Sequence, residues 1–326
     1  RRPWPCLWSI PQQRIVLGDR NEWHCILSGG LRMTQTPVCY GYQGKGNVGD
    51  NLMFLLNTAG FEAVYVRKGR RVRPDDIELG ALAYLWQCVA AEELIFSGGN
   101  IFIVDRPRSV VKIAGFFLLV HLRRLMGKTT SFRSIGVNKN TPPFVRSIAI
   151  RTILAASRAH LRETSIISTA LWQRSADRHH RVEFAPDIVF TGDLDAVDQI
   201  NGFRNTAAPA DSHAVYFPSI VARREAAQQA TANPDAIALP DDITTVYVIV
   251  QAVEDADIAP DFLAGKDVVQ VQSGVETIDR ILALVLTARL VVTERYHGAI
   301  LAKRFGIPMI TSNYSEKLRD IEMIAQ

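Results

Sequence analysis

Residues 290–298, LVVTERYHG, decide how the rest of this chain is organised. The three apolar residues at the start of this stretch predict a short buried strand. Residues 299–305 then predict a helix, and we expect it to end at Gly306, because glycine commonly follows the last helical residue. The stretch is therefore a strand, a short turn and a helix.

Arg295 and His297 are expected in the turn between this strand and the start of the helix. In an open α/β sheet, ligands bind beyond the carboxyl ends of the strands, and a helix N-terminus favours an anion. Arginine offers a planar fork for a carboxylate or phosphate, and histidine can transfer a proton near neutral pH. The alternative is an exposed arginine beside a histidine that caps the helix, and this stretch alone leaves both open.

Length and composition describe a globular protein with material for two cores. The chain has 326 residues, of which 48% are hydrophobic and 21% charged, and its net charge is +4. This length suits two domains of about 150 residues each. The arginines are spread along the chain, a pattern that argues against a nucleic-acid surface and suits an anionic small ligand.

The cysteines and the apolar runs indicate in which cellular compartment the protein is expected. Four cysteines without CxxC spacing favour reduced thiols in a cytoplasmic protein, and we expect no metal site. No apolar run reaches the ~18 residues that span a bilayer. The nearest run, residues 110–122, contains Lys112 and is followed by Arg123 and Arg124. It predicts a buried helix with a basic end, and contact with the inner face of a membrane is the alternative.

Repeated strand–helix units predict an α/β protein with two doubly wound, Rossmann-like parallel-sheet domains. One expected helix spans residues 77–90. We expect an irregular N-terminal extension at residues 1–32, which hold three of the five tryptophans. The predicted division of the remaining chain is an N-terminal domain at 33–190, an aperiodic linker at 191–212 and a C-terminal domain at 213–326.

Two glycine-rich turns follow predicted strands of the first domain. Residues 41–50, GYQGKGNVGD, come after one strand, and residues 97–100, SGGN, come after another. The spacing matches neither a Walker A loop nor a Rossmann GxGxxG motif, so it does not support nucleotide binding by those routes. Asp50 either caps the following helix or takes part in chemistry.

Taken in order, these motifs resemble the polysaccharide pyruvyl transferase family, over about residues 37–325. The family usually has three glycines at the position of Ser97 and aspartate at the position of Glu163. The matching pieces are residues 41–50, residues 97–100 with Asp105 nearby, LRETS at 161–165, PDIVF at 186–190, ED at 254–255, RYHG at 295–298 and FGIP at 305–308.

The resemblance implies an architecture similar to that of the GT-B glycosyltransferases. It also implies that phosphoenolpyruvate is a co-substrate, with no cofactor, and that its pyruvate is transferred to two hydroxyls of a sugar or lipid-linked oligosaccharide. The products are a cyclic ketal and phosphate. By the same resemblance, the donor-binding residues are Arg162, Arg295, His297 and Gly298. The first domain then binds the acceptor, with candidates Gly44, Asn47, Gly49, Asp50, Gly98, Gly99 and Asn100.

The expected chemistry assigns roles to four residues. His297 is expected to act as the acid, Asp50 as the base, and Arg295 to stabilise the departing phosphate together with Arg162. Two other functions stay open. One is a GT-B glycosyltransferase that uses a nucleotide sugar, because fold alone does not separate the two enzymes. The other is a carbohydrate- or anion-binding protein that has lost its activity.

Overall fold

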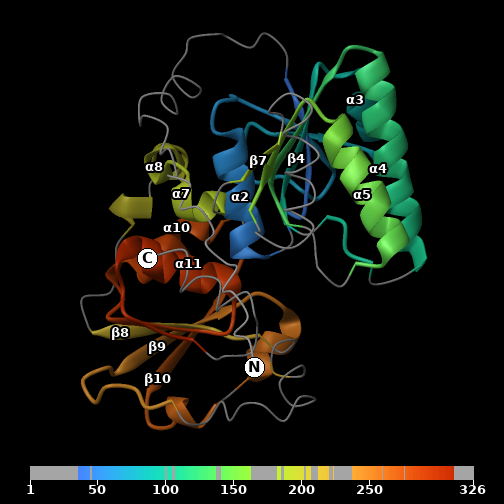
Figure 1. Cartoon of the computed structure of the whole chain (residues 1–326). Coiled ribbons are helices and arrows are strands. Elements are labelled where there is room, and N and C mark those ends of the chain that lie inside the picture. Colours follow the sequence, from blue (N-terminus) through green and yellow to red (C-terminus); the bar gives the residue numbers. More distant parts are fainter. Residues whose placement is uncertain are drawn as a thin grey trace, which may run out of the picture. The chain divides into compact units, whose positions relative to one another are not determined.

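The structure, a computed structural model, describes residues 36–311, with several short gaps. The described part contains two parallel sheets with helices packed on them (Figure 1). The extension expected at residues 1–32 lies outside the described residues. The gaps are residues 45, 100, 105–106, 137–140, 163–181, 185–186, 202, 207–211, 220–222, 224–236, 259 and 275.

The first sheet has seven strands in the order β3-β2-β1-β4-β5-β6-β7, and all its pairings are parallel. The chain builds outward from β1 to β3 and then crosses back to β4, so the strand order reverses between β1 and β4. In such sheets this switch point is where a ligand binds. The strands are β1 (Val38–Gly41), β2 (Tyr65–Arg67), β3 (Ile77–Leu79), β4 (Glu93–Gly99), β5 (Thr129–Ile135), β6 (Arg158–Leu161) and β7 (Val182–Phe184).

The second sheet repeats this order with five strands, β10-β9-β8-β11-β12, again all parallel. Its switch point lies between β8 and β11. The predicted fold class, two Rossmann-like parallel sheets in tandem, is therefore confirmed. The strands are β8 (His213–Phe217), β9 (Thr245–Val250), β10 (Asp267–Gln272), β11 (Leu290–Thr293) and β12 (Met309–Thr311).

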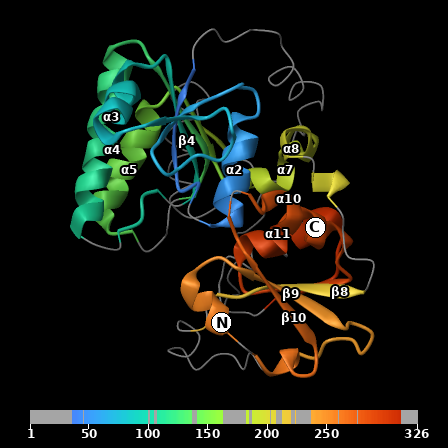
Figure 2. The same ribbon diagram turned by 180° about the vertical axis from the view of Figure 1, so that it is seen from behind.

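Helices cover both faces of the first sheet. Helices α3, α4 and α5 lie on one face and α2 lies on the other (Figures 1 and 2). Alternate strand residues fill the two cores: Phe96 packs in the core of α3–α5 and Ile95 in the core of α2. The helices are α2 (Val48–Thr58), α3 (Ala81–Ala90), α4 (Pro107–Leu125), α5 (Pro143–Ala155), α7 (Ile188–Thr191), α8 (Leu194–Asn201), α10 (Ile278–Thr287) and α11 (Tyr296–Phe305), with the 3₁₀ segments η1 (Phe203–Asn205), η3 (Val253–Asp257) and η4 (Asp261–Leu263).

A single apolar core joins helices of both halves. Helix α2 packs against α10 and α11, and residues such as Leu52, Ile281 and Ile300 belong to one buried cluster. Gln35–Gln326 accordingly forms one compact unit. The position of α11 relative to the first sheet is therefore set by burial of apolar surface, the main favourable term in folding.

Helix α7 is held at both ends by α11. Its N-cap, Asp187, lies near His297 at the start of α11. At the other end, Arg304 donates to the carbonyl of Val189, at 2.8 Å, and to the carbonyl of Gly192. These are carbonyls of the last turn, which have no partner inside the helix. A helix of one turn is thereby fixed against a helix of the second half.

Two expectations about secondary structure are wrong. Residues 77–79 form the edge strand β3 and only residues 81–90 are helical, because extended Gly80 separates the two elements. The stretch 191–212 is not an irregular linker throughout, since it contains α8 and η1, and Leu194, Val197 and Phe203 are buried in the core. The division of the chain into domains stays a prediction.

Arg123 belongs to the expected basic end of this helix, and the structure buries it completely. Its guanidinium donates to the carbonyls of Cys88 (2.8 Å) and Ala91 (3.0 Å) at the end of α3, and to the carbonyl of Thr129 (2.6 Å). The last carbonyls of a helix lack partners inside the helix. Arg123 supplies these partners and so joins α3, α4 and β5.

We expect Arg123→Leu to lower the free energy of unfolding by about 3 kcal/mol or more, because several buried carbonyls would lose their donors. Arg124→Leu is the matched control, since Arg124 is exposed one residue further along the same helix. Its effect should stay within about 0.5 kcal/mol. Chemical denaturation of both variants measures the difference, and equal stability would contradict the structural role of Arg123.

Candidate functional site

Helix α11 begins at Tyr296, earlier than the sequence predicts, and Arg295 is its N-cap. His297 is thus the second residue of the helix and does not lie in the turn. The expected end at Gly306 is confirmed, with a left-handed φ of 70°. Thr293 fixes the turn before the helix: its hydroxyl accepts from the Arg295 amide at 3.0 Å and donates to the Arg295 carbonyl at 2.8 Å.

Gly298 lets the first turn of α11 lie directly on the second sheet. A Cβ at this position would be 2.4 Å from Thr293 Oγ1 and 2.8 Å from the ring of Phe217. Both distances are shorter than a real contact allows, so a larger residue would push the helix away from the strands. Gly298 therefore positions the N-terminus of α11, the end at which its neighbours Arg295 and His297 lie.

The imidazole of His297 is enclosed between two elements of the first half. Its Nε2 lies 3.7 Å from Asp187 Oδ2, an ion-pair distance that is too long for a hydrogen bond. Its ring lies against the backbone of Gly49, where a Cβ would be only 1.9 Å from Nδ1. The side chain is 14% exposed. The position of His297 is thus set by the carboxylate of Asp187 and by Gly49, which has no side chain to exclude the ring.

Arg162 follows β6 directly, as the sequence predicts, and shares the carboxylate of Asp187 with His297. Its Nη1 donates to Asp187 Oδ2 at 2.8 Å, and its guanidinium carbon lies 5.5 Å from the ring centroid of Tyr296. A guanidinium over an aromatic face is attractive, more so where water is excluded. Arg162 is therefore held by α7 and by α11 together.

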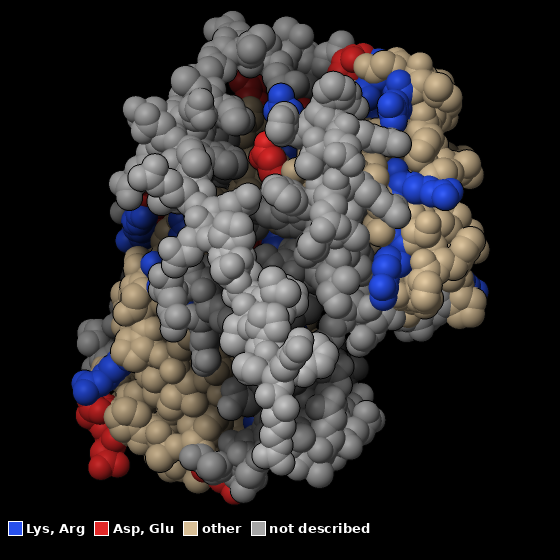
Figure 3. Space-filling view, in the orientation of Figure 1, with Lys and Arg blue, Asp and Glu red and all other residues tan. Residues whose placement is uncertain are grey.

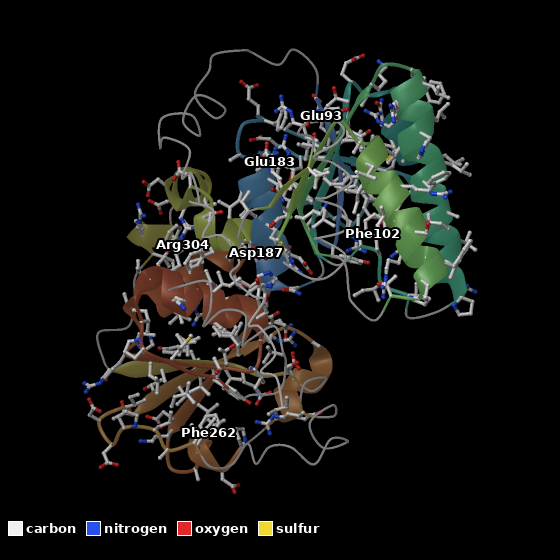
Figure 4. The ribbon with its side chains drawn as sticks, viewed as in Figure 1. Glu93, Phe102, Glu183, Asp187, Phe262 and Arg304 are labelled. Carbon is white, nitrogen blue, oxygen red and sulfur yellow. The ribbon has the colours of Figure 1, made fainter. Side chains whose placement is uncertain are left out.

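Asp187 is the centre of this group of charges and is almost completely buried. Its Oδ1 accepts from the amide of Val189 at 3.0 Å, which caps α7. Burial alone would raise its pKa, but the nearby His297 and Arg162 hold the pKa of Asp187 well below its ordinary value. The carboxylate is therefore ionised near neutral pH. Figure 4 shows Asp187 beside α2 and α11.

Asp50 lies in the first turn of α2, but it does not cap this helix. Asn47 is the N-cap, and its side chain accepts from the amides of Gly49 (3.0 Å) and Asp50 (3.5 Å). Burial raises the pKa of Asp50, and the charges of His297 and then Arg162 act in the opposite direction. The carboxyl of Asp50 thus belongs to the same electrostatic environment as His297, Arg162 and Asp187.

The two glycine turns lie beside Asp50 at the switch point of the first sheet. Gly98 and Gly99 end β4 with φ of 59° and 77°, which favours glycine. A Cβ on Gly99 would be 3.5 Å from Asp50 Oδ1. The amide of Gly44 donates to Asn51 Oδ1 at 2.7 Å, which holds the first turn closed. Asn100, also an expected acceptor residue, lies outside the described residues.

Arg295 lies at the switch point of the second sheet, between the ends of β8 and β11. Its Nε donates to the carbonyl of Pro218 at 2.6 Å, and its guanidinium forms an ion pair with the buried Asp255. Three positive charges lower the pKa of Asp50. That of His297 has the largest effect, that of Arg162 comes next, and that of Arg295 has the smallest. The structure therefore brings Asp50, Arg162 and His297 together, and it places Arg295 in their electrostatic environment.

The sequence did not predict that Asp187, Asp255 and Tyr296 contact the expected site residues. Asp187 pairs with Arg162 and His297, Asp255 pairs with Arg295, and Tyr296 lies under the guanidinium of Arg162. Asp187 and Asp255 lie in motifs noted in the sequence, and Tyr296 lies between Arg295 and His297. Asp187 precedes an apolar run, which is a helix N-cap signal, but its pairing with Arg162 has no local signal. Within the described ranges, no group of three or more His, Cys, Asp or Glu residues could hold a metal ion.

Several solved structures are similar to this chain at low sequence identity. One is an uncharacterised protein of Klebsiella pneumoniae that is 15% identical. The match covers 94% of this chain and 94% of that protein, with a TM-score of 0.48. The UDP-GlcNAc 2-epimerase of Methanocaldococcus jannaschii is 10% identical. The match covers 77% of this chain and 78% of the epimerase, with a TM-score of 0.42. Heptosyltransferase WaaC of E. coli, solved with ADP, is 11% identical and covers 85% and 86%, with a TM-score of 0.36.

The comparison with curated proteins found no match. A family model described as polysaccharide pyruvyl transferase matches residues 47–316. The match begins at the N-cap of α2 and extends past β12. It therefore includes Asp50, Arg162, Asp187 and the whole of α11. Since this span is most of the sequence, the chain belongs to the polysaccharide pyruvyl transferase family.

Proposed function

We propose that the protein transfers pyruvate from phosphoenolpyruvate to two hydroxyls of one sugar unit, forming a ketal and releasing phosphate. The observation that carries this proposal is the group of charges around Asp187. Arg162 and His297 both lie at this carboxylate, and Asp50, with a raised pKa, lies in the same environment. The site thus combines cations for an anionic donor with a carboxyl suited to proton transfer.

The donor proposal rests on charge and preorganisation. Phosphoenolpyruvate carries a carboxylate and a phosphate close together, and charge-assisted hydrogen bonds from arginine suit both groups. Arg162 is oriented by Asp187, and Arg295 by Asp255. A guanidinium has five N–H donors, so a carboxylate partner can fix its plane and leave donors for a ligand. The first-turn amides of α11 add a further site for an anion.

The reaction needs one proton delivered and two removed. A proton added to the methylene carbon of phosphoenolpyruvate gives an oxocarbenium-like centre at C2, and the first sugar hydroxyl attacks it and loses its proton. The second hydroxyl then takes the place of the phosphate, which leaves with its bonding electrons, and that hydroxyl also loses its proton. A positioned acid and a positioned base each contribute about 10²–10⁴-fold to such steps.

We assign the acid to His297 and the base to Asp50. The imidazole of His297 lies at the start of α11, and its Nε2 is 3.7 Å from Asp187 Oδ2. The raised pKa of Asp50 makes its carboxylate a stronger base than an exposed aspartate. The glycine turns beside Asp50, with Asn47 and Gly99, form the proposed acceptor side.

The direct test is phosphate release from phosphoenolpyruvate with a panel of free and lipid-linked sugars. We also expect phosphoenolpyruvate to raise the melting temperature, since a ligand that binds only the folded state stabilises it. Stabilisation by a nucleotide sugar in place of phosphoenolpyruvate would support a glycosyltransferase. Stabilisation by phosphoenolpyruvate without phosphate release from any acceptor would support a binding protein without activity.

His297→Gln should bind phosphoenolpyruvate within a few-fold of the parent and lose at least about 10²-fold in phosphate release, because glutamine cannot deliver a proton. Donor affinity, melting temperature and turnover are measured on one preparation. His121→Gln is the control, since His121 lies on α4 and its Nδ1 bonds within the helix, to the Phe117 carbonyl. Turnover that survives in folded His297→Gln protein would place the acid elsewhere.

Arg295 is tested by a substitution that keeps the buried charges balanced. Arg295→Gln combined with Asp255→Asn removes the guanidinium and leaves no unpaired carboxylate. We expect donor binding to weaken by about 1.5–3 kcal/mol, the range for hydrogen bonds to charged groups. The control is Arg289→Gln with Asp242→Asn, an exposed ion pair beside the same sheet. Equal donor affinity in the two double variants, measured by calorimetry, would remove Arg295 from the donor site.

Asp50 as the base predicts a specific pH dependence. The base works in its deprotonated form, so kcat/KM should rise with pH through a pKa above the ordinary value of 3.8. Asp50→Asn should lose this limb together with at least about 10²-fold in rate.

The same substitution has an independent readout in stability. A group whose pKa is raised by folding stabilises the protein at low pH, and this contribution is lost as pH rises through the folded pKa. Removing the charge should therefore leave the melting temperature at pH 7 unchanged or higher. A less stable Asp50→Asn protein with normal turnover would contradict the assignment.

A further inference from the structure

Helix α4 is apolar on two opposite faces, and one of them is exposed. Ile113, Phe116 and Val120 face the core, as expected for a helix on a sheet. A second apolar row, at intervals of seven, four and three residues, faces outward: Val111, Leu118, Leu122 and Leu125, of which Leu125 is 87% exposed. A helix that is hydrophobic all round is normally covered on every side. In the described part of the chain, one side of α4 is exposed.

The two neighbouring helices extend this exposed apolar surface. Helix α4 packs against both α3 and α5, and the three lie side by side in Figure 2. On α3, Leu82, Leu85 and Trp86 form one apolar face, with Trp86 68% exposed. On α5, Phe144 is 70% exposed. Continuous exposed apolar surface of this kind marks a site of contact with a partner or a membrane.

The charges on this surface have one sign. The sequences of α3, α4 and α5 contain neither aspartate nor glutamate. Arg108, Arg124 and Arg151 are exposed on α4 and α5, and none of them forms an ion pair with another residue in the described ranges. Figure 3 shows blue side chains spaced over tan surface on the side where these helices lie. We call this apolar and basic surface the α3–α5 face.

Two other basic residues of α4 do not belong to this face. Arg123 is buried against the end of α3. Lys112 donates to the hydroxyl of Tyr42 at 3.1 Å, toward the glycine turn. The basic character of the α3–α5 face therefore comes from Arg108, Arg124 and Arg151. Their guanidinium groups are exposed, and so are the leucines and the tryptophan of the same face.

We propose that the α3–α5 face docks on the surface of a bilayer that contains anionic lipids. Leucine and tryptophan side chains enter the headgroup region of a membrane, and flanking arginines attract anionic headgroups. A second copy of this chain would bring the same unpaired arginines against each other, which opposes a symmetric dimer through this face. Docking means lying on the membrane, because no helix in the described ranges is long and apolar enough to cross one.

The test is flotation of the purified chain with vesicles of two compositions. The chain should bind vesicles of equal parts phosphatidylglycerol and phosphatidylcholine at low salt. It should bind pure phosphatidylcholine vesicles at least about tenfold more weakly, and 0.5 M NaCl should release it, because salt screens exposed charges. Arg108→Gln with Arg124→Gln should weaken binding by about fivefold per arginine.

The apolar part is tested by Leu118→Glu with Leu125→Glu, which should reduce binding at least about tenfold, because two charges would have to enter the headgroup boundary. Both positions are exposed, so folding should be kept, and the melting temperature checks this. The control is Val268→Glu on β10, an exposed apolar residue of the second sheet, and it should bind as the parent does.

Three results would overturn the proposal. The first is failure of the parent chain to bind anionic vesicles, and the second is equal binding by the Leu118→Glu and Leu125→Glu variant. The third is a dimer in light scattering that this variant dissociates, since the face would then be covered by a second copy. The readout is lipid binding and not turnover, so failure here and failure of the phosphate-release assay are separate results.

Discussion

The carboxylate of Asp187 is the group on which the site depends. It is buried, and a buried charge is stable only when it is paired and hydrogen-bonded. Arg162 and the amide of Val189 donate hydrogen bonds to it, and His297 lies at ion-pair distance. These partners come from the end of β6, from α11 and from α7, so one charge fixes the relative positions of three elements. Removing one partner of a buried ion pair commonly costs about 3–5 kcal/mol, which ties the geometry of the site to the stability of the fold.

Close approach of two helix N-termini is the second constraint. The ring of His297 lies on the backbone of Gly49, and Gly298 lets α11 lie on its own sheet. The same contact buries Asp50, one residue after Gly49, and burial is the main reason that its pKa rises. Packing of α2 against α11 therefore does two things at once. It orients the proposed acid, and it changes the proton affinity of the proposed base.

The two proposed functions lie on opposite faces of the first sheet. Helix α2, on one face, contributes Asp50 and contacts α10 and α11 through a common core. Helices α3, α4 and α5, on the other face, form the surface proposed to dock on a bilayer. The glycine turns emerge between these layers at the switch point of strand order, where side chains of either face can reach a ligand. An acceptor sugar carried on a lipid would suit this arrangement.

The sequence by itself determined most of the succession of strands and helices, the place of Arg162 at a strand end and the stop at Gly306. These follow from local periodicity and from the conformational freedom of glycine, which depend on residues close in the chain. Tertiary structure alone decided that Asp187 pairs with Arg162 and His297, and that Asn47, not Asp50, caps α2. It also decided that residues 194–201 form a helix with Leu194 and Val197 in the core, and that one of the two apolar rows of α4 stays exposed. Burial and ion pairing depend on residues far apart in the chain, and no local pattern contains that information.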